Sequence, residues 1–314
     1  MQQTFNLGKQ LGIIKKKRRK VRDDDGWAAY LFVLPWVLGF LVFTLYPIIR
    51  SFYLSFTDYS LLSEPIWVGL QNYVNILTAD RDFTKSLGVT FMFVIIGVPV
   101  RMFTSLMVAM LLNQKLKMMS FYRTMFYFPS LIGASVAVAT LWRNMFGLDG
   151  YINNILSWFG IQGMGWISNP KSALGTLILL YAWQFGSTMV IFLAGLKSIP
   201  IDLYESADID GAGAIGKFLH ITLPMLSPVI FFNLIMSMIN AFQMFTSAFV
   251  IANGGPAHAT YTYALFLYEK AFTRYQMGYA SALAWILLLI VGVLTAINFY
   301  FSKKWVFYED GGNK

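Results

Sequence analysis

Four carboxylates stand close together between two long apolar segments, and this cluster is the densest group of charged side chains there. The cluster consists of Asp202, Glu205, Asp208 and Asp210. A helix that lies on anionic lipid carries Lys and Arg instead. The favoured interpretation is a short helix that enters a groove on another protein, with Leu203, Tyr204 and Ala207 as apolar contacts. The alternative is an ordinary loop that happens to be acidic.

The rest of the sequence offers little material for catalysis. The chain has no Cys, and its two histidines, His220 and His258, lie far apart. Thiolate chemistry is therefore excluded, and neither histidine has a metal-ligand spacing. We find no Gly-rich phosphate loop and no paired carboxylates in a pocket-forming segment. The sequence thus predicts that the chain is not an enzyme and that it binds no metal or nucleotide by itself.

Polar side chains recur inside two apolar segments. In the segment near residue 240 they follow three- and four-residue steps and would share one helical face: Asn233, Ser237, Asn240, Gln243, Met244 and Ser247. A second segment carries Trp183, Gln184 and Ser187. Amides and hydroxyls can bond sugar hydroxyls, and an aromatic ring shields sugar C–H groups. These residues therefore predict a solute path, with interhelical hydrogen bonding as the alternative.

Arg101 is the most unusual residue, because it lies near the middle of an apolar segment, two residues after Pro99. A central Arg costs at least about 2.5 kcal/mol to insert, so contact with lipid is disfavoured. Three explanations remain open. The guanidinium bonds carbonyls freed by Pro99, pairs across a subunit interface, or contacts an anionic saccharide such as a uronate oligomer.

Composition indicates which kind of secondary structure carries these residues. The chain has 314 residues, of which 57% are hydrophobic and 12% charged, and its mean hydropathy is +0.58. Apolar runs of about 20 residues cross bilayers as helices. The sequence predicts an all-α membrane protein with six spans, near residues 27–49, 87–113, 124–146, 173–196, 229–252 and 280–301.

Basic residues predict the orientation of these spans. The tail before residue 27 carries seven basic residues between Lys15 and Arg22. If it is cytoplasmic, the other cytoplasmic segments also carry Lys or Arg: Lys115, Lys117, Arg123, Lys197, Lys217, Lys303 and Lys304. This arrangement obeys the positive-inside rule and puts both termini in the cytoplasm. The tail is expected to be a retained topology signal, with contact to anionic lipid as an alternative. The charge of +9 is explained by topology, so nucleic-acid binding is not expected.

The acidic cluster then falls in a cytoplasmic loop, 197–228, that is longer than a simple turn requires. Pro200 can start a helix, and the carboxylates of Asp202 and Glu205 suit the positive N-terminal end of that helix. Gly211 allows the chain to turn. The loop is predicted to hold a short helix, a turn at Gly211 and a second helix from about Ala214. We expect three regions: a basic tail at 1–26, a membrane domain at 27–302 and a cytoplasmic tail at 303–314.

The loop resembles a known family. Glu205-Ser206-Ala207, then Gly211-Ala212 and Ile221-Thr222-Leu223-Pro224, are similar to the EAA loop of permease subunits of binding-protein-dependent ABC importers. Further similarity lies with the carbohydrate branch that contains maltose-transporter permeases, in Gly69–Tyr73, Phe121–Arg123, Asn253–Pro256, Tyr268–Phe272 and Gly278–Ala282. Ser206 stands where the family usually has Ala, and the large external domain of the enteric maltose permease is missing.

The resemblance implies a type I importer fold and an ATP-driven sugar importer, with an oligosaccharide as the expected cargo. Its partners would be a second permease subunit, two ATPase subunits that hold ATP and Mg, and an external sugar-binding protein. The chain would lie in a prokaryotic inner or plasma membrane. Docking of the ATPase would involve Tyr204, Glu205, Ser206, Ala207, Asp210, Gly211, Ala212, Leu223 and Pro224. Sugar contacts would lie near Trp183, Gln184, Ser187, Ser237, Asn240 and Met244, with Gln243 and Arg101 as further path candidates.

Two other functions are weighed against an importer. A secondary carrier needs an intramembrane acid for ion coupling, and no predicted span contains Asp or Glu. A membrane scaffold or regulatory subunit that only recruits an ATPase stays as the alternative.

Overall fold

The computed structural model describes residues 26–114, 117–133 and 135–307, most of them in helices. The chain forms two units, Met1–Ser51 and Phe52–Lys314. In the described part of the first unit, α1 (Gly26–Phe40), π-helix η2 (Leu41–Leu45) and the start of α2 (Tyr46–Ser55) follow one another without interruption. Phe32 and Phe43 are 86% and 82% exposed, as expected of side chains that contact lipid. The first predicted span is therefore helical.

The second unit contains two short antiparallel strands and the remaining helices. The strands are β1 (Thr57–Asp58) and β2 (Ile66–Trp67). The helices before the acidic cluster are α3 (Gln71–Thr78), α4 (Arg81–Leu112), α5 (Met119–Ile132), α6 (Val136–Met145), α7 (Tyr151–Trp158), α8 (Pro170–Trp183) and α9 (Gly186–Ser198). Those that follow are α10 (Ile201–Ile209), α11 (Ala214–Lys217), π-helix η3 (Phe218–Thr222), α12 (Leu223–Met225), α13 (Ser227–Phe242), α14 (Thr246–Ile251), α15 (Tyr263–Tyr268), π-helix η4 (Glu269–Thr273) and α16 (Met277–Ser302).

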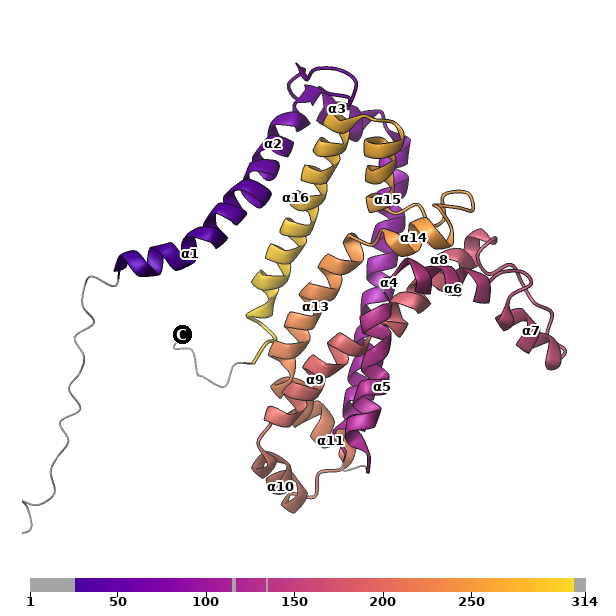
Figure 1. The fold of residues 1–314 in the computed structure, drawn as a ribbon. Helices are drawn as coiled ribbons and strands as arrows, with labels where there is room; N and C mark the ends of the chain where they lie inside the picture. The colour runs from indigo at the N-terminus through magenta and orange to yellow at the C-terminus, as the bar shows by residue number, and fades with distance from the viewer. Residues whose placement is uncertain (1–25, 115–116, 134, 308–314) are drawn as a thin grey trace, which may run out of the picture. The chain divides into compact units, whose positions relative to one another are not determined.

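Helix α4 is the central element of the second unit. It packs against α8, α9 and α13, and its N-terminal part also contacts α15. Phe93 of α4 belongs to one buried cluster, with Tyr181 and Phe242, whereas Ala109 belongs to a second cluster with Phe192. Figure 1 shows α4, α13 and α16 running between α3 at one end and α10 and α11 at the other. A side chain in the middle of α4 therefore meets several neighbouring helices.

Six apolar segments agree with the predicted spans in position, but three are not single helices. Three helices are long and apolar enough to cross a membrane, Tyr30–Ser55, Arg81–Leu112 and Met277–Ser302, or up to six spans if each bent helix pair counts as one. The predicted span 124–146 forms α5 and α6, and 173–196 forms α8 and α9 with a bend of 45°. The predicted span 229–252 forms α13, which ends at Phe242, and the separate α14. The third bent pair lies elsewhere than this prediction, since it joins Ala214–Met225 to Ser227–Phe242 with a bend of 65°.

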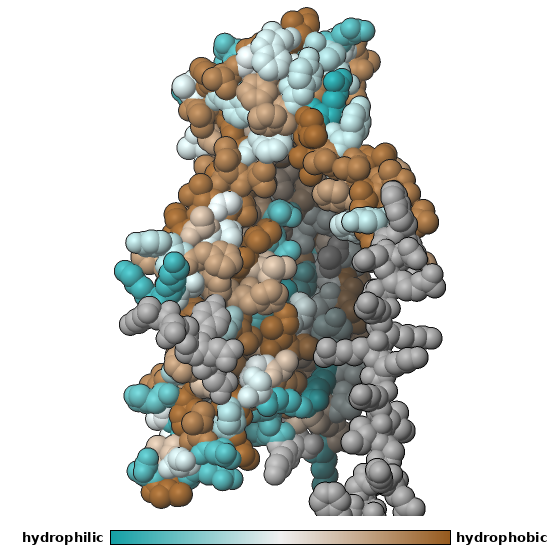
Figure 2. Space-filling view, turned by 90° about the vertical axis from the view of Figure 1, so that its left-hand side faces the viewer, coloured by the Kyte–Doolittle hydropathy of each residue, from teal (hydrophilic) through white to brown (hydrophobic). Residues whose placement is uncertain are grey.

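Exposed apolar side chains cover much of the surface. Figure 2 shows apolar residues over a large part of the visible face, with hydrophilic residues most numerous toward its lower end. Exposed large side chains of α4 include Ile95 and Phe103, which are 67% and 66% exposed. Such a surface is expected of a protein whose helices contact hydrocarbon. The predicted basic tail up to Asp25, Lys115 and the end of the C-terminal tail, 308–314, lie outside the described residues.

Candidate functional site

A cavity of about 310 Å³ opens beside the middle of α4. Its walls come from α4, from α8 and the break that follows it, and from the break between α13 and α14. They are formed by Arg101, Leu177, Tyr181, Gln184, Asn240, Gln243, Met244, Phe245, Thr246 and Ser247. One charged group, three side-chain amides and several hydroxyls thus meet two aromatic rings. This lining suits a polar solute with apolar faces.

Arg101 reaches this cavity from α4 and is buried, with 9% of its surface exposed. Its Nη2 lies 3.5 Å from Ser187 Oγ, which is the outer limit of a hydrogen bond. The guanidinium carbon lies 4.6 Å from the ring centroid of Tyr181, a cation–π geometry. The buried Nε has no hydrogen-bond partner among the described residues. The protein therefore leaves part of this cation's bonding capacity unused.

The break between α8 and α9 shapes the same cavity. A Cβ on Gly186 would lie 2.6 Å from Ser130 Oγ and 2.7 Å from the Phe126 carbonyl, so α5 approaches this point too closely for any side chain. Ser130 Oγ accepts from the Ser187 amide at 3.0 Å and donates to the Gln184 carbonyl at 3.2 Å. The hydroxyl thus compensates for backbone groups that lose helical partners at the bend.

The second break, between α13 and α14, contributes the opposite wall. The polar face predicted on one continuous helix does not exist in that form, because α13 ends at Phe242 and Gln243 and Met244 lie outside it. The Met244 carbonyl accepts a hydrogen bond from Thr262 Oγ1 at 3.1 Å, which satisfies a backbone group at the break. Three- and four-residue spacing alone could not reveal this break, since the polar pattern continues across it.

The structure brings six of the predicted path residues to the cavity: Arg101, Gln184, Asn240, Gln243, Met244 and Ser247. Ser187 is exposed and contacts Arg101 from outside the lining. Trp183 and Ser237 do not line it. The ring of Trp183 packs on Trp142, with centroids 5.9 Å apart, and Ser237 is buried, with its carbonyl accepting from Tyr181 Oη at 2.7 Å.

Sequence reasoning missed four lining residues, Leu177, Tyr181, Phe245 and Thr246. Tyr181 lies three residues before Gln184, so helical spacing from the predicted position could have found it. Thr246 and Phe245 lie at the end of the second break. Their location follows from a backbone interruption that no sequence signal marked.

Arg101 does not bond the carbonyls expected to be freed by Pro99. Helix α4 continues through Pro99, and among the described residues the Arg101 side chain donates only to Ser187. The Arg101 carbonyl accepts from Ser105 Oγ at 2.6 Å and from Thr104 Oγ1 at 2.9 Å, so hydroxyls one turn later satisfy this part of the helix. The first of the three explanations for this residue is therefore not supported.

The acidic cluster lies in a helical hairpin, residues 201–225, made of α10, α11, η3 and α12. The predicted turn at Gly211 is present, with φ of +75°. The Ala212 amide donates to the Ala207 carbonyl at 2.9 Å, and the Gly211 amide donates to the Asp208 carbonyl at 3.1 Å. These two bonds form a Schellman motif, in which glycine is the residue best suited to the left-handed position.

Contacts within the 201–225 hairpin fix its two arms. Tyr204 Oη lies 2.9 Å from Thr222 Oγ1, and Lys217 Nζ lies 2.6 Å from Asp208 Oδ1. Tyr204 thus makes its polar contact inside the chain, and Ala207 is half-buried. The most exposed large apolar side chains are instead Ile209 and Ile215, at 88% and 77%. Sequence reasoning did not select them, although both flank the glycine turn.

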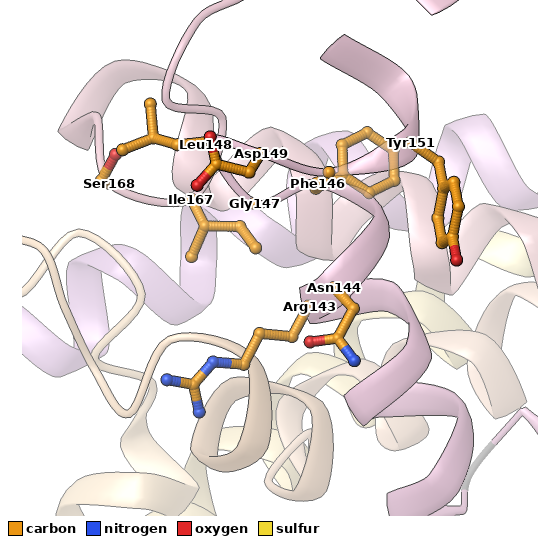
Figure 3. A pocket seen from close by; sticks show the side chains of 10 residues that line it. Arg143, Asn144, Phe146, Gly147, Leu148, Asp149, Tyr151, Ile167 and Ser168 are labelled. Atoms are coloured by element: carbon orange, nitrogen blue, oxygen red, sulfur yellow. The ribbon is translucent and has the colours of Figure 1, made fainter. Parts of the chain in front are cut away.

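A second cavity, of about 660 Å³, lies away from the first and is lined by the end of α6, residues 146–150 that connect it to α7, Tyr151 and residues 167–168. Figure 3 shows Arg143 and Asp149 on different sides of this space, with Tyr151 at the start of α7. Arg143 is exposed, and its Nη1 lies 3.5 Å from the Val250 carbonyl. The described part of the chain contains no group of three or more metal-ligating side chains.

An ion-pair cluster lies beside the N-terminus of α4. Asp80 Oδ2 accepts from Lys270 Nζ at 2.9 Å and from Tyr279 Oη at 2.6 Å, and Asp80 Oδ1 caps α4 through the Asp82 amide at 2.9 Å. Burial would raise the pKa of Asp80, but the bonds from Tyr279 and Lys270 outweigh it and lower that pKa. The cluster thus joins α4, η4 and α16 through one ionised carboxylate.

Comparison with known proteins gives consistent results. Residues 76–306 match the family described as binding-protein-dependent transport system inner membrane component. The probable ABC transporter permease protein YesP of Bacillus subtilis (strain 168) is 51% identical over 298 residues, which cover 94% of this chain and 96% of that protein. The lactose transport system permease protein LacF of Rhizobium radiobacter is 36% identical, over 91% of this chain and 96% of its own.

A similar fold occurs in a solved structure. The crystal structure of a bacterial alginate ABC transporter, in complex with an alginate pentasaccharide-bound periplasmic protein, contains a chain that matches with a TM-score of 0.78. The match covers 90% of this chain and 95% of that one, at 21% identity. At this identity the match shows a shared fold.

Proposed function

Because the chain belongs to the family of binding-protein-dependent transport system inner membrane components, we propose that it is a permease subunit of an ATP-driven sugar importer. The observation that carries the proposal is the cavity beside Arg101, where amides, hydroxyls and aromatic rings meet inside a helical membrane protein. Relatives named as lactose and arabinooligosaccharide permeases support a saccharide as cargo, and we propose an oligosaccharide.

In the proposed arrangement the chain crosses a prokaryotic cell membrane six times. Helices α5 and α6 together form one span, α8 and α9 form another, and the fifth span begins with α13. Both termini and the 201–225 hairpin face the cytoplasm, where Lys197, Lys217, Lys303 and Lys304 satisfy the positive-inside rule. The loops 50–86, 147–172 and 253–279 face outward and receive the sugar-binding protein. No separate large external domain is needed for this docking.

The 201–225 hairpin is the proposed contact to an ATPase subunit. Two ATPase subunits bind ATP and Mg, and this chain supplies no residue for nucleotide. Exposed Ile209 and Ile215 flank the turn and offer an apolar contact, while Asp202, Glu205 and Asp210 surround it with negative charge. A second permease chain completes the path. Closure of the ATPase pair then moves the hairpin as a rigid body and shifts the adjoining spans.

The proposal is tested by purifying the tagged chain in mild detergent from cells that express the complete transport system. We expect an ATPase and a second permease to copurify with the native chain. The amount of ATPase that copurifies should be at least about tenfold lower for Ile209→Asp, since this substitution places a carboxylate in an apolar contact. Leu62→Asp is the matched control, because Leu62 is 92% exposed but lies in the turn between β1 and β2.

ATP-dependent uptake of saccharides by the reconstituted native complex completes the test. A chain that recruits the ATPase while the complex takes up no sugar would be a scaffold or regulatory subunit. A chain that transports sugar after purifying alone would overturn the proposed role of the 201–225 hairpin.

A further inference from the structure

The charge of Arg101 has no counterpart in the part of the chain that the structure describes. No Asp or Glu oxygen lies within 4.0 Å of its guanidinium among these residues. The helices packed around it, α8, α9 and α13, contain no Asp or Glu in their sequences. A guanidinium in such surroundings is costly unless another group bonds it.

Part of the Arg101 side chain borders the cavity. Arg101 is one of the lining residues, and its Nε is buried without a partner. Its hydrogen bond to Ser187 is long, and the ring of Tyr181 covers one side of the guanidinium. A planar guanidinium with one side stacked on an aromatic ring keeps its in-plane donors for a planar acceptor, and carboxylates match this geometry.

Pairing with a carboxylate of a second subunit fits less well. Arg101 is already 91% buried by its own chain, since only 9% of its surface is exposed. A carboxylate from another subunit would have to enter the cavity itself to reach the guanidinium. The group that completes this site is therefore better sought among molecules that pass through the cavity.

We propose that Arg101 binds the carboxylate of an acidic saccharide, so that the imported sugar carries a uronic acid unit. This inference rests on the proposed importer function and names its substrate class. Gln184, Asn240 and Gln243 bond the sugar hydroxyls, and the rings of Tyr181 and Phe245 contact its C–H faces. The volume of about 310 Å³ is at the lower end of ligand sites and suits one or two sugar units at a time.

The test uses the complete complex in proteoliposomes, with its own binding protein outside. The probes are di- and trisaccharides of galacturonate, glucuronate and mannuronate, each beside its methyl ester, which keeps the shape but removes the charge. A neutral disaccharide panel and the corresponding sugar phosphates are added. We expect ATP-dependent uptake of at least one uronate, with a preference for it over its ester and over the phosphate.

Arg101→Gln should lower uptake of that uronate at least about tenfold, the effect of losing a charge-assisted bond, and change ester uptake much less. Arg101→Lys should take up more of that uronate than Arg101→Gln and less than the native complex, because lysine keeps the charge but lacks the planar guanidinium. Arg143→Gln is the matched control, since Arg143 is an exposed arginine that lines the separate cavity of Figure 3. It should change uptake of neither probe.

Binding gives a second measurement that does not depend on turnover. The uronate that the native complex imports should bind its nucleotide-trapped form, and Arg101→Gln should weaken that binding while the assembled complex keeps its composition. Equal losses for uronate and ester in the variant overturn the proposal. Import of neutral sugars or sugar phosphates with no uronate import also overturns it. Failure to import any saccharide instead overturns the proposed importer function.

Discussion

At the scale of single residues, Gln184 combines a hydrogen bond between helices with a position in the cavity lining. Its Nε2 donates to the Gly133 carbonyl at 2.8 Å, which ties the end of α8 to the end of α5. The same residue lines the cavity. The two interpretations of the polar path residues, a solute path and interhelical hydrogen bonding, therefore do not exclude each other. Substituting such a residue changes both the packing and the cavity.

Gly186 lies where neighbouring atoms leave no room for a side chain. We expect Gly186→Ala to lower the stability of the detergent-purified protein by about 1–3 kcal/mol, because its Cβ would meet the Phe126 carbonyl at 2.7 Å and Tyr127 Cα at 2.8 Å. Thermal unfolding followed by intrinsic fluorescence measures the change. Gly175→Ala is the control, since nothing lies within 4 Å of its added Cβ. Equal stability of the two variants would contradict the close approach of α5 and α9.

Asp80 is expected to make the stability of the protein depend on pH in the acidic range. Its pKa is lowered in the folded state, so its stabilising effect is complete above its ordinary value of about 3.9 and is lost as the pH falls through the folded pKa. The temperature midpoint of thermal unfolding should therefore decrease as the pH is lowered below about 4. In Asp80→Asn this part of the pH dependence should be absent.

The same substitution should destabilise the protein at neutral pH by about 3 kcal/mol, because it leaves the Lys270 ammonium without its partner in a mostly buried site. Glu64→Gln serves as the control, since Glu64 is exposed in the turn between β1 and β2. A pH profile of Asp80→Asn that runs parallel to that of the native protein would show that another carboxylate causes the acid sensitivity.

At the scale of elements, the sequence predicted where apolar segments lie better than it predicted their continuity. Hydropathy placed α4 and α16 well, because a long run of apolar residues must be helical in a bilayer. It could not place the break before Gly186, which depends on a contact with Ser130 more than 50 residues earlier in the chain. The 201–225 hairpin was predictable, since Pro200 and Gly211 are local signals. The interruption after Phe242 carries no such signal.

The Schellman motif in the 201–225 hairpin leads to a prediction about ATPase association. Gly211→Ala places a Cβ at a residue with φ of +75°, which costs about 1–2 kcal/mol, and should loosen the angle between α10 and α11. We expect less ATPase to copurify with this variant. Gly213→Ala should have little effect, because Gly213 has φ of −71° and nothing lies within 4 Å of its added Cβ. Equal recovery for both variants would show that the turn geometry does not matter for docking.

At the scale of the whole second unit, the cavity and the 201–225 hairpin are joined by two helices, α9 and α13. Helix α9 begins at Gly186, two residues after the cavity residue Gln184, and ends at Ser198, shortly before α10 begins at Ile201. Helix α13 makes the return connection, since it begins at Ser227 after the hairpin and ends at Phe242, directly before the cavity residue Gln243. We therefore expect a displacement of the hairpin to reach both breaks that wall the cavity. This connection gives a physical basis for proposing that nucleotide-driven motion alters access to the sugar site.

That coupling requires the 201–225 hairpin and the external loops to face opposite sides of the membrane, which cysteine labelling can test. The chain contains no native Cys, so single cysteines can be introduced without removing others. In intact cells, or in spheroplasts where an outer membrane is present, an impermeant maleimide should label Ser63→Cys and Asn154→Cys, which are exposed positions in the proposed outer loops. Gln114→Cys, exposed just after α4, should react only after permeabilisation, because the positive-inside rule places it with Lys117 in the cytoplasm. Labelling of Gln114→Cys before permeabilisation would reverse the orientation and separate the hairpin from any cytoplasmic ATPase.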